Sequence, residues 1–185
     1  MAAIQTALSL EKDEARRHAY RARILRIQEK WPEAEAELRQ ALRLRPNIAN
    51  WRNRLGIALR RQKTLDEAVE HYQEAIRLDP CNAVYHSNLG NVLRDQKKPA
   101  EAEAEYRKAI QLTPDHALIR KNLGLCLEEQ KKIQEAEGEF RKAATLRPQR
   151  ALYRNELGAF LMRTGKNQEA EAQLCGVHQK SHPGR

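Results

Sequence analysis

The sequence has few of the residues that disulfide scaffolds and β-rich folds require. Its three cysteines, Cys81, Cys126 and Cys175, form neither a C-x-x-C pair nor an even-numbered framework, so reduced thiols are expected. Aromatic residues make up only 5% and there are eight glycines, whereas Ala, Glu, Leu, Arg and Lys are abundant, as in proteins built from amphipathic helices. The composition therefore predicts an all-α chain.

Long hydrophobic runs and catalytic motifs are also missing. Charged residues make up 32% and the mean hydropathy is −0.83, so no segment approaches the roughly 18 apolar residues of a membrane span. The first ten residues lack the features of a secretory signal, which favours a cytoplasmic location. No P-loop, Rossmann, G-x-S-x-G or H-E-x-x-H pattern occurs, so we expect no enzyme and no cofactor. His178 and His182 have chelating spacing but no third ligand, so no metal site is expected.

The sequence contains a repeat with a period of 34 residues. Pro46, Pro80, Pro114 and Pro148 follow one another at this interval, which is typical of stacked helical repeats. The predicted repeats are 15–48, 49–82, 83–116, 117–150 and 151–182. Each proline disfavours helix in the residue before it, and Asn47, Asn82 or Asp115 is expected to cap the helix that follows.

Small and large residues occupy fixed positions in these repeats. The two small columns are Ala22, Gly56, Gly90, Gly124 and Gly158, and Ala34, Ala68, Ala102, Ala136 and Ala170. The large columns include Leu55, Leu89, Leu123 and Leu157, and Leu38, Tyr72, Tyr106 and Phe140. Small residues on two successive helices allow close approach, with the larger ones interdigitating around the crossing. Each repeat is therefore predicted to be an αα-hairpin, with Leu44, Leu78, Leu112 and Leu146 facing the next hairpin.

The motifs L-G-x-x-L, A-x-x-x-Y and D-P, as in Leu55-Gly56, Ala68 to Tyr72 and Asp79-Pro80, resemble the tetratricopeptide repeat. The resemblance covers nearly the whole chain and implies a right-handed αα-superhelix of about five repeats that binds proteins in a concave groove. Residues 1–14 resemble part of a second helix, either a solitary cap or the stump of a longer array, and self-association through this helix stays open. Residues 183–185 have nothing to pack against and are expected to be disordered.

On the first helix of each repeat, the stripe opposite the core-facing positions lines the groove in this family. Its early part is basic and rich in amides, and its late part, with Leu118, Leu152 and Met162, is mostly apolar. The predicted binding residues are Arg23, Arg26, Asn53, Arg54, Arg60, Asn88, Asn91, Arg94, Lys121, Asn122 and Leu125. Any exposed helical surface presents some Arg and Asn, but an apolar run without a core to fill favours a contact site. Since Asn can pair with a peptide backbone and Arg with carboxylates, we predict an extended, partly acidic peptide as ligand.

The distribution of charge and the family's known binding modes limit the classes of partner that we expect. Of the net charge of +9, residues 15–48 contribute +5, from nine Lys and Arg against four Asp and Glu, so an acidic partner segment is expected there. No stacking platform or groove-reading motif accompanies this charge, which argues against nucleic acid. The carboxylate clamp of members that bind Hsp70 or Hsp90 chaperones is not matched, because Leu152 and Glu156 follow the nearest pair, Asn91 and Asn122.

Two function classes remain from the sequence. One is a non-catalytic adaptor or scaffold that binds a partner segment in its groove. The other is the repeat arm of a larger enzyme, such as a glycosyltransferase of the O-GlcNAc transferase kind, which also carries Asn along its groove. Repeat columns do not select between them, because groove side chains are tuned separately from the fold.

Overall fold

A computed structural model describes residues 11–175 of the chain, and in this range it contains ten α-helices and no strand. The chain divides into two compact units, residues 1–98 and 99–185, which we call the N-terminal and C-terminal units. The N-terminal unit holds α2 (Glu14–Ile27), α3 (Trp31–Leu44), α4 (Ala49–Arg61), α5 (Leu65–Leu78) and α6 (Ala83–Asp95). The C-terminal unit holds α7 (Pro99–Leu112), α8 (Ala117–Glu129), α9 (Ile133–Leu146), α10 (Ala151–Arg163) and α11 (Asn167–Cys175).

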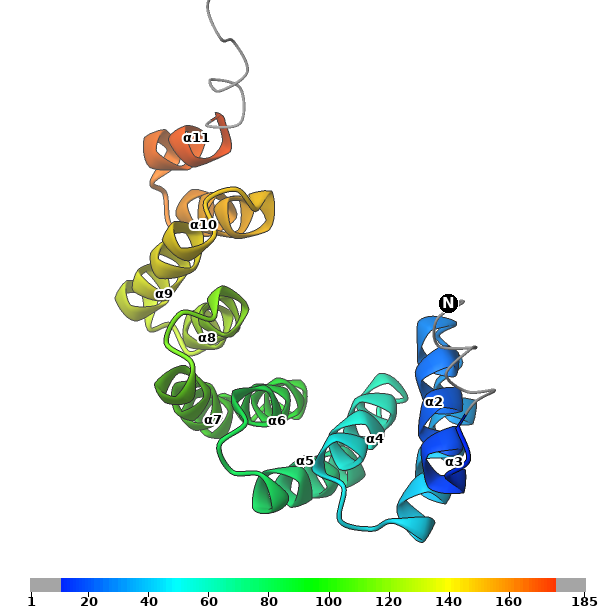
Figure 1. Cartoon of the computed structure of the whole chain (residues 1–185). Helices are drawn as coiled ribbons and strands as arrows, with labels where there is room; N and C mark the ends of the chain where they lie inside the picture. The colour runs from blue at the N-terminus through cyan, green and yellow to red at the C-terminus, as the bar shows by residue number, and fades with distance from the viewer. Residues whose placement is uncertain (1–10, 176–185) are drawn as a thin grey trace, which may run out of the picture. The chain divides into compact units, whose positions relative to one another are not determined.

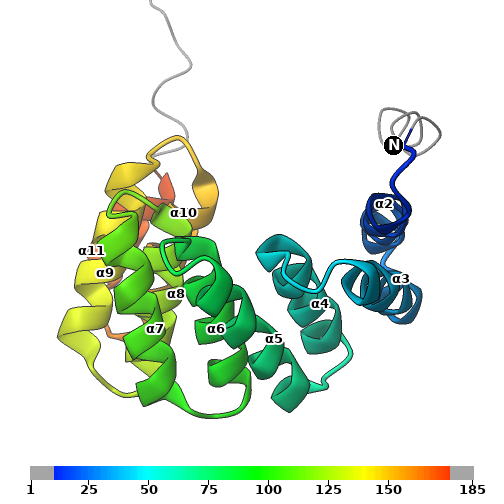
Figure 2. The same ribbon diagram turned by 60° about the horizontal axis from the view of Figure 1, so that its bottom comes forward.

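Within each unit, consecutive helices pack as hairpins that stack on one another (Figure 1). In the N-terminal unit, α2 packs on α3 and α4 on α5, and Figure 2 shows α4, α5 and α6 following one another. In the C-terminal unit, α8 packs on α9 and α10 on α11. The first helices of successive repeats also touch, as α4 and α6 do, and α8 and α10. The predicted all-α repeat solenoid is confirmed. The repeat boundaries stay a prediction, since the division between the units falls inside the third predicted repeat.

A left-handed residue closes the first helix of each hairpin. The backbone φ angle is positive at Glu29, Lys63, Lys97, Lys131 and Gly165, which are spaced by the repeat period. The amide of the next residue then bonds back to the helix, as from Lys30 to the carbonyl of Leu25 and from Thr64 to the carbonyl of Leu59, both at 3.0 Å. This left-handed termination satisfies end carbonyls and reverses the chain.

The predicted core columns are buried. Ala34, Ala68, Ala102, Ala136 and Ala170 are no more than 1% exposed, and Tyr72, Tyr106 and Phe140 are among the largest fully buried side chains. The small column on the first helices leaves room for these rings. A Cβ atom built at Gly56 would lie 2.8 Å from a ring carbon of Tyr72, which is too close for a real contact. The hairpin of α4 and α5 therefore depends on glycine facing the ring of Tyr72.

Two predictions about the loops and helix ends hold only in part. Asn82 caps α6 as expected, accepting a hydrogen bond from the Val84 amide at 3.2 Å. Asn47 and Asp115 do not cap, because the N-cap positions of α4 and α8 are one residue later, at Ile48 and His116, and neither side chain caps its helix. In the column predicted to face the next hairpin, Leu44 and Leu112 are 50% and 39% exposed. Leu78 and Leu146, which also end their helices, are half-buried.

No helix within residues 11–175 is long and apolar enough to cross a membrane. The prediction of a partial helix that could self-associate falls mostly on residues 1–10, which lie outside the described residues. The predicted tail, residues 183–185, and the pair His178 and His182 lie outside them as well.

Candidate functional site

The predicted stripe of the N-terminal unit lies on α2, α4 and α6, and its residues differ in exposure. Arg23 and Arg26 are exposed, and Asn53 is buried at 6% exposed. The remaining predicted residues of this unit, Arg54, Arg60, Asn88, Asn91 and Arg94, are half-buried. The stripe is therefore part surface and part packing layer, and only its exposed part offers groups to a ligand directly.

Three of the predicted arginines gather between α2 and α4. Arg23, Arg26 and Arg54, which we call the arginine cluster, line one small depression, whose lining also includes Ala22 and Ala58. Burial lowers the pKa of the Arg54 guanidinium, and the positive charges of Arg23 and Arg26 lower it further. Within the described residues, no carboxylate forms an ion pair with any of the three. The cluster is thus a concentration of uncompensated positive charge on a partly desolvated surface.

An open cavity adjoins the arginine cluster at Arg54. It has a volume of about 230 Å³ and is lined by Arg16, Ala19, Tyr20, Trp51 and Arg54. Arg54 belongs to both hollows and hydrogen-bonds through Nε to the side-chain oxygen of Asn50 at 3.0 Å. Aromatic rings beside guanidinium groups provide both apolar contact area and charge, which is typical of protein-binding hot spots.

Other predicted residues of this unit are engaged within the protein. Nε of Arg60 donates to Asp95 at 2.7 Å, so its charge is neutralised. The side-chain amide of Asn88 donates to the side-chain oxygen of Asn53 at 2.8 Å, joining α6 to α4. Sequence reasoning missed Asp95, although a charge of opposite sign 35 residues after Arg60 was a visible signal. These contacts hold neighbouring repeats together, so these groups are less available to a ligand than the arginine cluster.

The predicted stripe of the C-terminal unit is apolar at its surface. Leu118, Leu152 and Met162 are 43%, 49% and 57% exposed on α8 and α10. The predicted binding residues of this unit are less accessible, since Lys121 and Leu125 are half-buried and Asn122 is buried. The predicted residues therefore fall into two sets, one in each unit.

An ion pair also joins the first helices of two successive repeats in this unit. Arg163 donates from Nε and Nη2 to the two carboxylate oxygens of Glu128, at 2.8 and 2.9 Å. It joins α10 to α8 at the same spacing of 35 residues as the pair of Arg60 with Asp95, and sequence reasoning missed it as well. Residues 11–175 contain no group of three His, Cys, Asp or Glu side chains that could hold a metal ion.

The comparisons with known proteins agree with this architecture. The tetratricopeptide repeat family model matches residues 21–83 and 87–151, well over half of the chain. No curated protein sequence gives a significant match. The family match covers most of α2 through α9 and therefore the arginine cluster as well as the start of the C-terminal stripe.

Several solved structures share the fold at low sequence identity. PilF of Pseudomonas aeruginosa is 23% identical, with a TM-score of 0.77 over 88% of this chain and 75% of that one. MamA of Desulfovibrio magneticus RS-1 is 21% identical, with a TM-score of 0.76 over 88% and 92%. YrrB, described as a tetratricopeptide protein with an unusual peptide-binding site, is 22% identical, with a TM-score of 0.66 over 94% and 89%. Sequence identities at this level show only that the fold is shared. None of the three structures supports the alternative of a glycosyltransferase arm.

Proposed function

This chain belongs to the tetratricopeptide repeat family, and from that premise we propose that it is a binding module whose N-terminal unit takes an extended, acidic segment of a partner protein. Proteins of this fold serve as interaction modules, so a protein or peptide ligand is the coarse expectation. We also propose that the chain acts by binding alone and catalyses no reaction.

The observation that carries the proposal is the uncompensated charge of the arginine cluster. Three guanidinium groups near one another repel, and partial burial of Arg54 weakens its hydration. A carboxylate placed among them relieves the repulsion and gains charge-assisted hydrogen bonds, which are about twice as strong as neutral ones. An anionic ligand is therefore favoured at this position over a neutral or cationic one.

The neighbouring cavity supports an extended peptide as the form of that ligand. A segment that places an acidic side chain at the cluster can place its next apolar side chain against Tyr20 and Trp51, because Arg54 lines both hollows. YrrB, whose peptide-binding site is described as unusual, provides a precedent for peptide binding on this fold.

The test is a peptide array probed with the full chain. Acidic peptides and their isosteric Gln and Asn counterparts are compared for wild type, for Arg23→Ala with Arg26→Ala, and for Arg43→Ala with Arg77→Ala. The two double variants lose the same charge, and Arg43 and Arg77 lie outside both hollows. We expect wild type and the Arg43/Arg77 variant to retain the acidic peptides, and the Arg23/Arg26 variant to bind at least about tenfold more weakly.

Equal loss in both double variants would mean that only net charge matters, and the proposed site would be rejected. Binding of a single-stranded oligonucleotide in preference to every acidic peptide would replace the proposal with nucleic-acid recognition. The oligonucleotide result is not expected, because the hollows at the cluster contain only two aromatic side chains, Tyr20 and Trp51, and no series of them for successive bases.

A further inference from the structure

A wide cavity lies in the C-terminal unit, and none of the predicted binding residues lines it. It has a volume of about 560 Å³, within the roughly 300–1,000 Å³ of typical organic-ligand sites. Its lining comes from the loop between α7 and α8, the start of α8, and the loop that leads into α10. The lining includes Leu112, His116, Leu118, Arg147, Arg150 and Tyr153.

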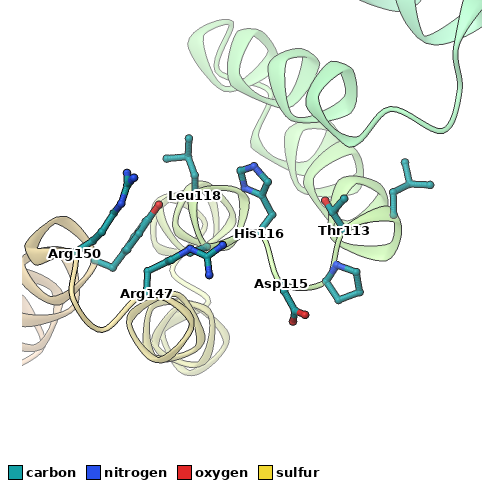
Figure 3. Close-up of a pocket in the computed structure, with 10 residues that line it drawn as sticks. Thr113, Asp115, His116, Leu118, Arg147 and Arg150 are labelled. Carbon is teal, nitrogen blue, oxygen red and sulfur yellow. The ribbon is translucent and has the colours of Figure 1, made fainter.

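The charged groups in the lining of this cavity include two arginines. Arg147 and Arg150 come from the same loop, and within residues 11–175 neither forms an ion pair with a carboxylate. Figure 3 shows Arg147 extending toward His116, whereas the carboxylate of Asp115 points away from both. The single negative charge of the lining is therefore not directed at the two guanidinium groups.

The helix ends add to this positive potential. α8 and α10 both begin at the cavity, with His116 and Arg150 as N-cap residues, and neither side chain makes a capping hydrogen bond. A helix N-terminus favours an anion, so a cation at the N-cap of α10 is unfavourable unless an anion lies between them. Nδ1 of His116 is buried and has no hydrogen-bond partner in the protein. The two arginines and the two helix N-termini thus lack a negatively charged partner within residues 11–175.

The lining of the cavity also includes apolar groups. Leu112 and Leu118 are 39% and 43% exposed, and Pro114 and the ring of Tyr153 line the cavity as well. An inorganic anion would leave these groups in contact with water. A ligand with an anionic head and an apolar body would contact both the arginines and these groups.

We propose that this cavity binds an organic phosphate monoester, with its phosphate at the two guanidinium groups and its apolar body against the two leucines. A phosphate monoester carries about −1.5 to −2 charges at neutral pH, which matches two arginines better than a single carboxylate does. Its three acceptor oxygens suit two guanidinium forks together with free helix-terminal amides. The ester is either a free small molecule or a phosphorylated side chain of another protein.

Calorimetric titration of the full chain tests this proposal. The probes are phenyl phosphate, phenol, benzoate, inorganic phosphate and a short phosphotyrosyl peptide. We expect saturable one-to-one binding of phenyl phosphate, at least about tenfold tighter than that of benzoate or inorganic phosphate, and no binding of phenol. A peptide that binds more tightly than phenyl phosphate identifies a modified protein as the source, and one that binds no better identifies a free ester.

Variants locate the site. Arg147→Ala and Arg150→Ala should each weaken phenyl phosphate at least about tenfold, and Arg77→Ala, which removes an equal charge elsewhere, should leave the affinity within about twofold. Arg147 and Arg150 are exposed, so their replacement leaves the core intact, which circular dichroism checks. Equal affinity for inorganic phosphate, or equal loss in the Arg77 variant, would overturn the proposal.

Discussion

Gly124 on α8 packs against the ring of Phe140 on α9. A Cβ atom built at Gly124 would come within 2.8 Å of Cε1 of Phe140, closer than packed atoms approach. Gly138, in the middle of α9 itself, has nothing within 4 Å of the same position. The two glycines thus share a secondary structure and a compact unit but differ in what a side chain would meet.

Alanine at these two glycines should have opposite effects on stability. Gly138→Ala should stabilise by up to about 1 kcal/mol, because alanine is the better helix former and meets no neighbour. Gly124→Ala gains the same propensity but forces the Phe140 ring to move, at a cost of about 1–3 kcal/mol. The free energies of unfolding of the two variants, from urea titration followed by circular dichroism, should therefore differ by about 1–3 kcal/mol. Equal stabilities would show that the close approach is not needed.

Glu103 on α7 accepts hydrogen bonds from three donors: Lys132 and Gln130 from the loop before α9, and Arg107 from α7 itself. Lys132 and Arg107 each reach its carboxylate at 2.8 Å, and Gln130 reaches it at 2.9 Å. Burial alone would raise the pKa of Glu103, but these hydrogen bonds outweigh it and lower the pKa to about 2. The ionised carboxylate is therefore the form that stabilises the fold.

The contribution of Glu103 should disappear in acid. Because its folded pKa is below the unfolded value of 4.5, its contribution is complete above that value and is lost as the pH falls toward 2. Glu103→Gln should destabilise by about 1–3 kcal/mol at pH 7, and most of this difference should be gone near pH 2. Thermal melts across this range measure the difference, with Glu101→Gln, an exposed neighbour on α7, as the control. A difference that persists unchanged at pH 2 would contradict this role.

The hydrogen bond between Asn88 and Asn53 should couple neighbouring repeats. Replacing each with alanine, alone and together, forms a double-mutant cycle, and we expect a coupling free energy of about 0.5–1.5 kcal/mol. Asn50→Ala with Asn88→Ala is a suitable control pair, since Asn50 bonds to Arg54 and not to Asn88. Coupling within error of zero would mean that the bond adds nothing to the junction.

The fold was predictable because small and large side chains recur at fixed positions of the 34-residue repeat. A ring such as Tyr72 needs a residue without a side chain opposite it, and Gly56 supplies that in a column of its own. The N-cap residues were harder to predict. The N-cap of α4 is Ile48 and not Asn47, and the loop sequence does not show this shift of one residue. The left-handed turn residues were missed for a related reason: four of the five are not glycine.

The candidate sites were predictable only in part. Helical spacing predicts that Arg23 and Arg54 lie on the groove-facing side of their helices. It does not show that Asp95 from the next repeat neutralises the charge of Arg60. Helical periodicity indicated only Leu118 in the lining of the cavity at Arg147 and Arg150, because the two arginines lie in a loop outside the stripe. A signal was nevertheless present, because an arginine stands at the N-cap of α10 where Asn82 caps α6.

The central claim is that the arginine cluster itself receives the acidic groups of a partner. The most direct measurement is an NMR titration of the arginine Nε–H signals of the full chain with a blocked hexaglutamate peptide, with hexaglutamine as control. We predict that the signals of Arg23, Arg26 and Arg54 shift first and saturate together, while those of Arg43 and Arg77 stay in place. Uniform shifts of all arginines, or no shift at the cluster, would contradict the account.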